Sequence, residues 1–142
     1  KYEMISWNVP YQPGTLAAVG YKNGKEVSKY AIETTTEPVK IQLTADRNAI
    51  AGDGWDAVPV SVEVLDAKGR HVPTANLPIE FEVNGAGKII GLGNGDANSH
   101  EPDKGTKISL YNGWAQVILQ SKLNSSGTVT LTAKCGNLQQ AR

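Results

Sequence analysis

Ala57-Val-Pro-Val-Ser-Val-Glu-Val-Leu65 is the stretch of sequence that decides the fold class. Every even-numbered position from 58 to 64 is valine, whereas Pro59, Ser61 and Glu63 occupy the odd positions between them. Because successive side chains of a strand point to opposite sides, this pattern predicts a strand with one core face and one solvent face. Valine suits such a surface because its branched Cβ already restricts χ1. Pro59 cannot donate to a ladder, which places it near the strand start or beside a bulge.

Composition and charge exclude several classes of function. The 142 residues include 14 basic and 14 acidic side chains, so the formal net charge is zero. This balance gives no electrostatic reason to expect nucleic acid or an anionic membrane as a partner. Apolar runs are too short to span a bilayer, the single Cys135 excludes an intrachain disulfide, and no motif calls for a cofactor. The chain begins at Lys1 without an initiator Met or signal-like run, and we expect it to be a piece of something longer.

Residues 1–36 are expected to form a small β-meander. The predicted strands are 1–9, 15–22 and 25–35, and Asn23-Gly24 between the last two is typical of a type I′ hairpin turn. Three strands of this size cannot bury enough apolar surface to be stable alone. We therefore interpret residues 1–36 as the last strands of a preceding β-sandwich domain. Docking of this segment on the second domain is the alternative.

Residues 38–142 carry a regular series of short, alternating apolar stretches separated by Gly, Pro and Asn turns, without a helical period. Strands are expected, besides 57–65, at 39–43, 79–83, 88–92, 108–111, 114–121 and 128–134, with a last one starting at 138. Asn112-Gly113 predicts a second hairpin, between 108–111 and 114–121. The predicted fold class is all-β, with an immunoglobulin-like antiparallel β-sandwich over 38–142. Its core must hold by aliphatic packing, because the Cys–Trp–Cys pattern of antibody domains is missing.

The loop over residues 91–105 is the best candidate for a site, because long loops in compact domains tend to be functional or disordered. Its polar side chains offer oxygens and one imidazole: Asn94, Asp96, Asn98, His100, Glu101 and Asp103. They could satisfy their own backbone in consecutive turns, contact a sugar or a neighbouring domain, or bind Ca²⁺. The spacing is not that of an EF-hand, so no metal ligand is assigned.

The three tryptophans and Tyr11 raise the possibility of carbohydrate binding, with a place at the domain junction as the structural alternative for Trp7. Trp55 lies in a predicted turn and Trp114 begins a predicted strand, so either ring could be exposed and stack on a sugar ring. The structural alternative for Trp114 is that it closes one end of the sandwich. Asp66, Glu80 and Glu82 are expected on polar strand faces, where water solvates them.

Several stretches of this chain resemble one enzyme family. The first set consists of a proline-rich segment, a turn and a linker: Trp7-Asn-Val-Pro-Tyr-Gln-Pro-Gly-Thr-Leu-Ala-Ala18, Tyr21-Lys-Asn-Gly-Lys25 and Thr34-Thr-Thr-Glu-Pro38. The second set spans the rest of the chain: Asp46-Arg47, Ala51-Gly-Asp-Gly-Trp-Asp56, Val64-Leu-Asp-Ala-Lys-Gly69, Val72-Pro73, Ile79-Glu-Phe81, Ile89-Ile-Gly-Leu-Gly-Asn-Gly-Asp96, Tyr111-Asn-Gly113 and Val117-Ile-Leu-Gln-Ser121. Together they resemble the carboxy-terminal accessory region of glycoside hydrolase family 2, in β-galactosidase-like members of the Bacteroides type.

The resemblance implies a parent glycosidase whose two catalytic glutamates lie on a separate barrel domain. A retaining mechanism needs two carboxyl groups about 5 Å apart, and no residue of this chain matches those catalytic motifs, so none is assigned a catalytic role. The first hypothesis is a structural module that packs on the barrel or on another subunit. The alternative is a carbohydrate-binding module that uses Trp55, Trp114 or the 91–105 loop; an adhesive cell-surface repeat is a third. The resemblance also implies a periplasmic or secreted location.

Overall fold

The computed structural model describes residues 4–142. They divide into two compact units, one that ends at Thr34 and one over Thr35–Arg142. The first unit contains β1 (Thr15–Lys22) and β2 (Lys25–Glu33), paired antiparallel with Leu16 opposite Ile32. Asn23 and Gly24 both have positive φ, 51° and 75°, as a type I′ turn requires. Apolar side chains on this hairpin, including Leu16 and Ile32, are exposed.

The strand predicted over residues 1–9 is wrong for its described part. Residues 4–9 are not part of any strand, and residues 1–3 lie outside the described part of the chain. A strand exists only when a neighbour completes its ladder, and β1 is paired with β2 alone among the described residues. The described first unit is therefore a two-stranded hairpin. That residues 1–36 end a preceding β-sandwich domain stays a prediction.

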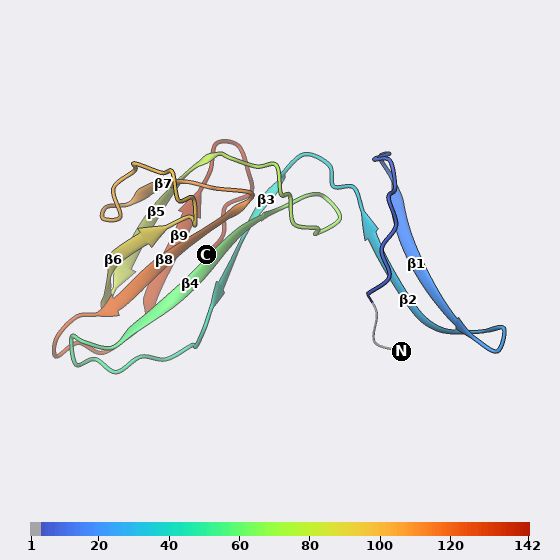
Figure 1. The fold of residues 1–142 in the computed structure, drawn as a ribbon. Coiled ribbons are helices and arrows are strands. Elements are labelled where there is room, and N and C mark those ends of the chain that lie inside the picture. The colour runs from blue at the N-terminus through green and yellow to red at the C-terminus, as the bar shows by residue number, and fades with distance from the viewer. Residues whose placement is uncertain (1–3) are drawn as a thin grey trace. The chain divides into compact units, whose positions relative to one another are not determined.

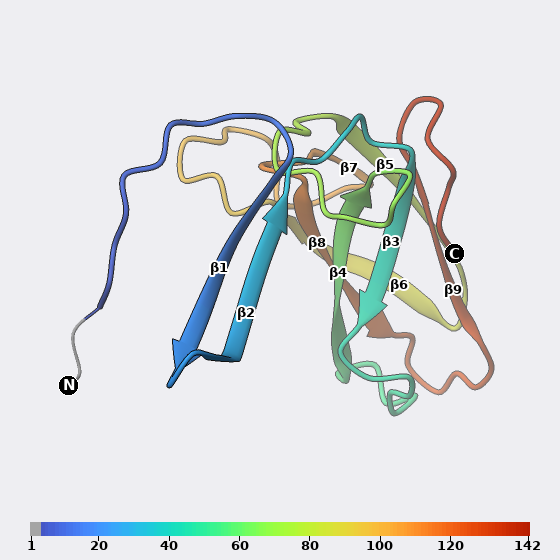
Figure 2. The same ribbon diagram turned by 90° about the vertical axis from the view of Figure 1, so that its right-hand side faces the viewer.

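The second unit is a sandwich of two antiparallel sheets (Figures 1 and 2). Its strands are β3 (Lys40–Ala45), β4 (Ala57–Leu65), β5 (Pro78–Gly85), β6 (Gly87–Gly93), β7 (Lys107–Ser109), β8 (Trp114–Ser121) and β9 (Val129–Lys134). The sheet orders are β3-β4-β8-β6 and β7-β5-β9. The four-stranded sheet places the first two strands of the unit beside β8 and β6, like the A-B-E-D sheet of immunoglobulin domains. The predicted fold class is confirmed, and residues 4–142 hold no helix able to cross a membrane.

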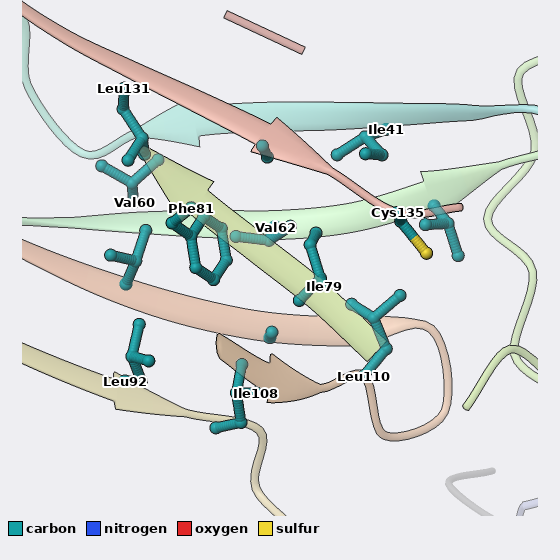
Figure 3. Packing of buried hydrophobic residues seen from close by; sticks show 14 of the residues in the cluster. Ile41, Val60, Val62, Ile79, Phe81, Leu92, Ile108, Leu110, Leu131 and Cys135 are labelled. Carbon is teal, nitrogen blue, oxygen red and sulfur yellow. The ribbon is translucent and has the colours of Figure 1, made fainter. Parts of the chain in front are cut away.

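The core lies between the two sheets, and the valine face of β4 lines it. Val62 and Val64 are fully buried, and Ile79 and Phe81 of β5 lie opposite Val62 in the other sheet (Figure 3). Full burial of one such aliphatic side chain contributes roughly 1.5–3 kcal/mol. Cys135 is part of this core, and burial raises the pKa of its thiol. The period of two in residues 57–65 therefore identified the core face of the central strand.

Pro59 is tolerated in a central strand because of where its backbone points. It is the third residue of β4, and its carbonyl accepts a hydrogen bond from the Asp46 amide at 3.1 Å. Within an antiparallel strand, the N–H and C=O of one residue face the same neighbour. The missing N–H of Pro59 therefore points toward β3, which has already ended at Ala45, so β8 loses no hydrogen bond.

The hairpin predicted around Asn112-Gly113 is only one residue pair long. The turn forms, with φ of 50° and 81° at its two residues, and Tyr111 bridges Trp114. However, β7 pairs with β5 in the opposite sheet and not with β8. The sequence could not distinguish the two arrangements, because Ile108 faces the same core from either sheet. At the end of the chain, the predicted last strand is reduced to isolated bridges, in which Gln139 pairs with Lys40 and Ala141 with Ala133.

Candidate functional site

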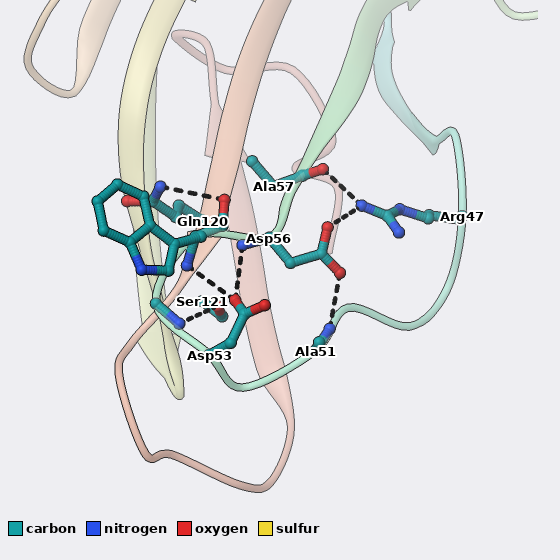
Figure 4. Close-up of polar contacts among 9 residues, drawn as sticks. Arg47, Ala51, Asp53, Asp56, Ala57, Gln120 and Ser121 are labelled. Atoms are coloured by element: carbon teal, nitrogen blue, oxygen red, sulfur yellow. Dashed lines mark hydrogen bonds and ion pairs between the residues drawn. The ribbon is translucent and has the colours of Figure 1, made fainter.

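Trp55 stands on a tightly hydrogen-bonded turn between β3 and β4. The Asp53 carboxylate accepts hydrogen bonds from the backbone amides of Trp55 and Asp56, both at 2.8 Å (Figure 4). The Gly54 amide donates to the Ser121 hydroxyl at 3.1 Å. The amide nitrogen of the Gln120 side chain donates to the Trp55 carbonyl at 3.3 Å. These contacts fix the backbone of the turn while the Trp55 residue stays 83% exposed.

Asp56 ties the same turn to the preceding loop. Its carboxylate pairs with Arg47 and accepts a hydrogen bond from the Ala51 amide at 2.7 Å (Figure 4). Arg47 also donates to the Ala57 carbonyl at 2.8 Å. The Ala51 amide and then the Arg47 guanidinium lower the pKa of Asp56, and backbone amides lower that of Asp53. Both carboxylates are therefore charged acceptors that order the turn near neutral pH.

Trp114 is held by a histidine at the opposite end of β8. Its indole stacks on the His71 imidazole, with ring centroids 4.5 Å apart and 28° between the planes. His71 Nε2 lies 2.9 Å from the Asn112 carbonyl, which can only accept, so this nitrogen donates. His71 Nδ1 lies 3.5 Å from a carboxylate oxygen of Glu63. Trp114 remains 44% exposed, so the indole is fixed on one side and open to solvent.

The two tryptophans lie near opposite ends of β8, since Trp114 begins the strand and the Trp55 backbone contacts Gln120 near its end. Along β8 the buried positions alternate with Trp114, Gln116, Ile118 and Gln120, which form the outer face. Trp114 begins this row, and Gln120 at its other end binds the carbonyl of Trp55. We call this row together with Trp55 the outer face of β8. The sequence could have predicted it, since 114, 116, 118 and 120 share one parity within a strand.

The 91–105 loop uses its side chains mainly on itself and on β7. The Asn94 side-chain oxygen accepts from the Asp96 amide at 3.0 Å, and the Asp96 carboxylate accepts from the Asn98 amide at 2.9 Å. The Glu101 carboxylate binds both the amide and the hydroxyl of Ser109, each at 2.9 Å. These are turn contacts of the kind that Asn and Asp favour. They engage the side chains of Asn94, Asp96 and Glu101, which are three of the six candidates for a sugar or metal contact, whereas Asn98 and Asp103 are exposed.

The remaining candidates of this loop do not assemble into a metal centre. His100 is exposed and makes none of these contacts. No group of three or more His, Cys, Asp or Glu side chains among residues 4–142 is placed to hold a metal ion.

Asp66 is a structural anchor that the sequence interpretation missed. We expected a solvated side chain, but Asp66 is completely buried. Its carboxylate accepts hydrogen bonds from the amides of Lys68 and Arg70 at 2.9 and 3.0 Å and from the Arg70 guanidinium at 2.8 and 2.6 Å. The Thr36 amide also donates to it, at 3.1 Å. These donors, the Arg70 side chain first, hold the pKa of Asp66 well below its usual range. The Asp-Ala-Lys-Gly pattern predicted a turn at this position, but it did not indicate that the Asp66 side chain is buried. Glu80 and Glu82, in contrast, are exposed as expected.

A cavity of about 450 Å³ opens at the loop end of the sandwich. It lies among residues of the 45–50 loop, the core strands β4 and β8, and the 127–129 segment. Val58, Val60 and Leu119 of its lining belong to the core, and Ile50 and Val129 pack against the core. It is the open end of the hydrophobic interior, and none of the predicted site residues lines it.

The fold and the surface geometry define an immunoglobulin-like β-sandwich module with exposed tryptophans on ordered turns. Residues 41–142 match the sequence model of the glycoside hydrolase family 2 C-terminal domain 5, and the chain belongs to this family. Residues 1–28 match a second model, a domain of unknown function.

The chain spans less than a fifth of the length of the first relatives that it matches. It is 37% identical to a β-galactosidase of Bacteroides ovatus over 96% of the chain, but this match spans only 16% of that enzyme. It is 31% identical to a putative β-glucuronidase of Formosa agariphila over 89% of the chain and 12% of that protein. A crystal structure of a glycosyl hydrolase family 2 member from Bacteroides cellulosilyticus superimposes with a TM-score of 0.88 at 34% identity, over 95% of this chain and 18% of that one. The resemblance noted in the sequence is therefore confirmed.

Proposed function

We propose that this chain is a non-catalytic accessory module of a β-galactosidase-like glycoside hydrolase, and that it packs on the catalytic barrel or on another subunit of the parent. The observation that carries the proposal is how the interior is filled. Among the described residues, the buried polar or charged side chains are Asp66 and Ser121, and both are bound to backbone amides. The interior between the sheets is otherwise aliphatic and aromatic, which leaves no place for the paired carboxyl groups of glycoside hydrolysis.

The parent activity rests on the relatives. The Bacteroides ovatus relative at 37% identity is a β-galactosidase, whereas the relative at 31% is a putative β-glucuronidase. Both are several times longer than this chain, and their matched regions are similar in extent. The choice between these substrates therefore depends on parts of the parent outside these residues. We further propose that the parent acts in the periplasm or outside the cell, which fractionation with an antibody against the sandwich unit would test.

The experiment compares the parent enzyme with a version that lacks these 142 residues. The accessory role predicts that the truncated enzyme still hydrolyses a chromogenic β-galactoside with an unchanged kcat per folded molecule. Its melting temperature or its oligomeric state should change, because an interface has been removed. A truncated enzyme that is folded, monodisperse and inactive would contradict a purely accessory role. An intact parent that prefers a β-glucuronide would correct the substrate assignment alone.

A further inference from the structure

We propose that the outer face of β8 is a binding platform for an extended chain of neutral sugars, with Trp114 at one end and Trp55 at the other. Aromatic rings stack on the apolar faces of pyranoses, and hydrogen-bonding groups between them engage the hydroxyls. The positions from 114 to 120 alone span about 20 Å at roughly 3.3 Å per residue. This length suits an oligosaccharide of several units and exceeds what a single sugar ring could bridge.

Both ring supports are ordered before any ligand arrives. The Trp55 turn is fixed through Asp53, Ser121 and Gln120, and Trp114 is stacked on His71. A preorganised site spends less of its binding energy on restricting side chains and loops. The two exposed tryptophans are thus built into rigid supports, unlike a ring on a free loop.

The centre of the face is uncharged and shallow. Gln116 is exposed and Ser61, opposite it on β4, is half-buried; neither side chain forms a hydrogen bond within residues 4–142. Gly91 of β6 lies opposite Ile118, and a Cβ on Gly91 would stand 3.5 Å from that side chain. The missing side chain keeps the face low at its middle. The Gln116 amide and the Ser61 hydroxyl can therefore form hydrogen bonds with the hydroxyl groups of a sugar.

The charges on this sheet favour a neutral ligand over an acidic one. The Glu63 carboxylate is already engaged by the Gln42 side chain at 3.0 Å and lies 3.5 Å from His71. Lys40 and Lys88 lie on β3 and β6, the two edge strands, where lysines commonly protect a sheet from edge pairing. Neither lysine belongs to the β8 row itself, although Lys88 lies directly opposite Gln120 at the end of the row. This charge distribution matches a neutral glycan, and the choice of a glycan rests on the proposed role in a glycosidase.

The test is titration calorimetry of the 142-residue chain with β-1,4-galactan, β-1,4-mannan and β-1,4-xylan, and with matched disaccharides and hexasaccharides. We expect at least one hexasaccharide to bind about tenfold more tightly than its disaccharide, because only the longer chain reaches both rings. Trp55→Ala should weaken hexasaccharide binding about tenfold without a change in melting temperature, since the residue is exposed. Trp7→Ala, which removes an exposed tryptophan from the first unit, is the matched control and should bind as the wild type does.

Three results would overturn the platform. They are failure of all these glycans to bind at millimolar concentration, equal affinity for short and long chains, and equal weakening by Trp55→Ala and Trp7→Ala. If the face is open in the parent enzyme, acrylamide should quench part of its tryptophan fluorescence, and this quenchable part should be missing from the Trp55→Ala variant. If it does not, another domain covers the face and the proposal fails. These outcomes are separate from the accessory role, which hydrolysis by this chain would refute whether or not it binds glycans.

Discussion

The Asp66 carboxylate accepts a hydrogen bond from the Thr36 amide at 3.1 Å across thirty residues of sequence. The Thr36 hydroxyl approaches the same oxygen at 3.4 Å. Through this contact, the turn that follows β4 holds the segment that leads into β3. The buried carboxylate fixes both the turn after β4 and the segment before β3, because a shift of either one would leave hydrogen-bond donors without their acceptor.

We expect Asp66→Asn to lower the melting temperature by about 10 °C or more. The amide removes the charge that faces the Arg70 guanidinium and replaces one acceptor oxygen with a donor. Circular dichroism melts at pH 7 would measure the loss. Glu80→Gln is the matched control, because Glu80 pairs with Lys107 at 3.3 Å on the exposed surface. This variant should melt within a few degrees of wild type. Equal melting of the two variants would contradict the anchoring role.

Acid should destabilise the sandwich through the same residue. The folded pKa of Asp66 lies below the unfolded value of 3.8, so the folded state favours the charged carboxylate. The stabilising contribution is therefore complete above about pH 4 and is lost as the pH falls below 3.8 toward the folded pKa. Urea unfolding between pH 6 and pH 2 would show it, and Asp66→Asn should flatten the decline. If the stability of Asp66→Asn falls with pH as steeply as that of wild type, other carboxylates cause the acid sensitivity.

Gly113→Ala should cost roughly 3 kcal/mol or more in unfolding free energy, whereas Gly69→Ala should cost about 1 kcal/mol. The two glycines have nearly the same φ, 81° and 78°. A Cβ on Gly113 would collide with the Val72 carbonyl and the His71 ring, but one on Gly69 would meet nothing within 4 Å. Both variants carry the same backbone strain, so the difference between their unfolding free energies measures the collision of the new Cβ with Val72 and His71. Equal costs would show that the 111–114 turn packs more loosely than described.

Phe81→Ala should destabilise the sandwich by about 3–5 kcal/mol, because it opens a cavity between the two sheets. Phe81 is 2% exposed, and its ring lies in the shared core. Leu123→Ala removes an apolar side chain that is 67% exposed and should change the unfolding free energy by less than about 0.5 kcal/mol. Urea denaturation of both variants provides the comparison. A small effect of Phe81→Ala would mean that the two sheets do not share one interior.

Local pattern was enough to predict most strands of the sandwich and the faces that they bury, but the predicted strands at the two ends of the chain did not form among the described residues. The alternation in 57–65 identified β4 and its core face, and the Asn-Gly pairs located both tight turns. The pairing of strands was harder to predict, because Ile108 would be buried whether its strand paired with β5 or with β8. The period of two assigns a face and not a neighbour.

The surface was harder to predict than the core. Trp55 and Trp114 were identified from residue type alone, but their placement on one face requires the Gln120 contact to the Trp55 carbonyl. The burial of Asp66 depends on Thr36 and Arg70 arriving from two sides, which no local pattern encodes.

The most direct test of the account is the glycosidase activity of the purified 142-residue chain. Chromogenic β-galactosides and β-glucuronides would be incubated with the chain and, in parallel, with the full parent enzyme at equal molar concentration. We predict that the chain alone releases no chromophore above the buffer rate while the parent turns over the galactoside. Hydrolysis by the chain alone that persists through repeated purification would contradict the accessory role.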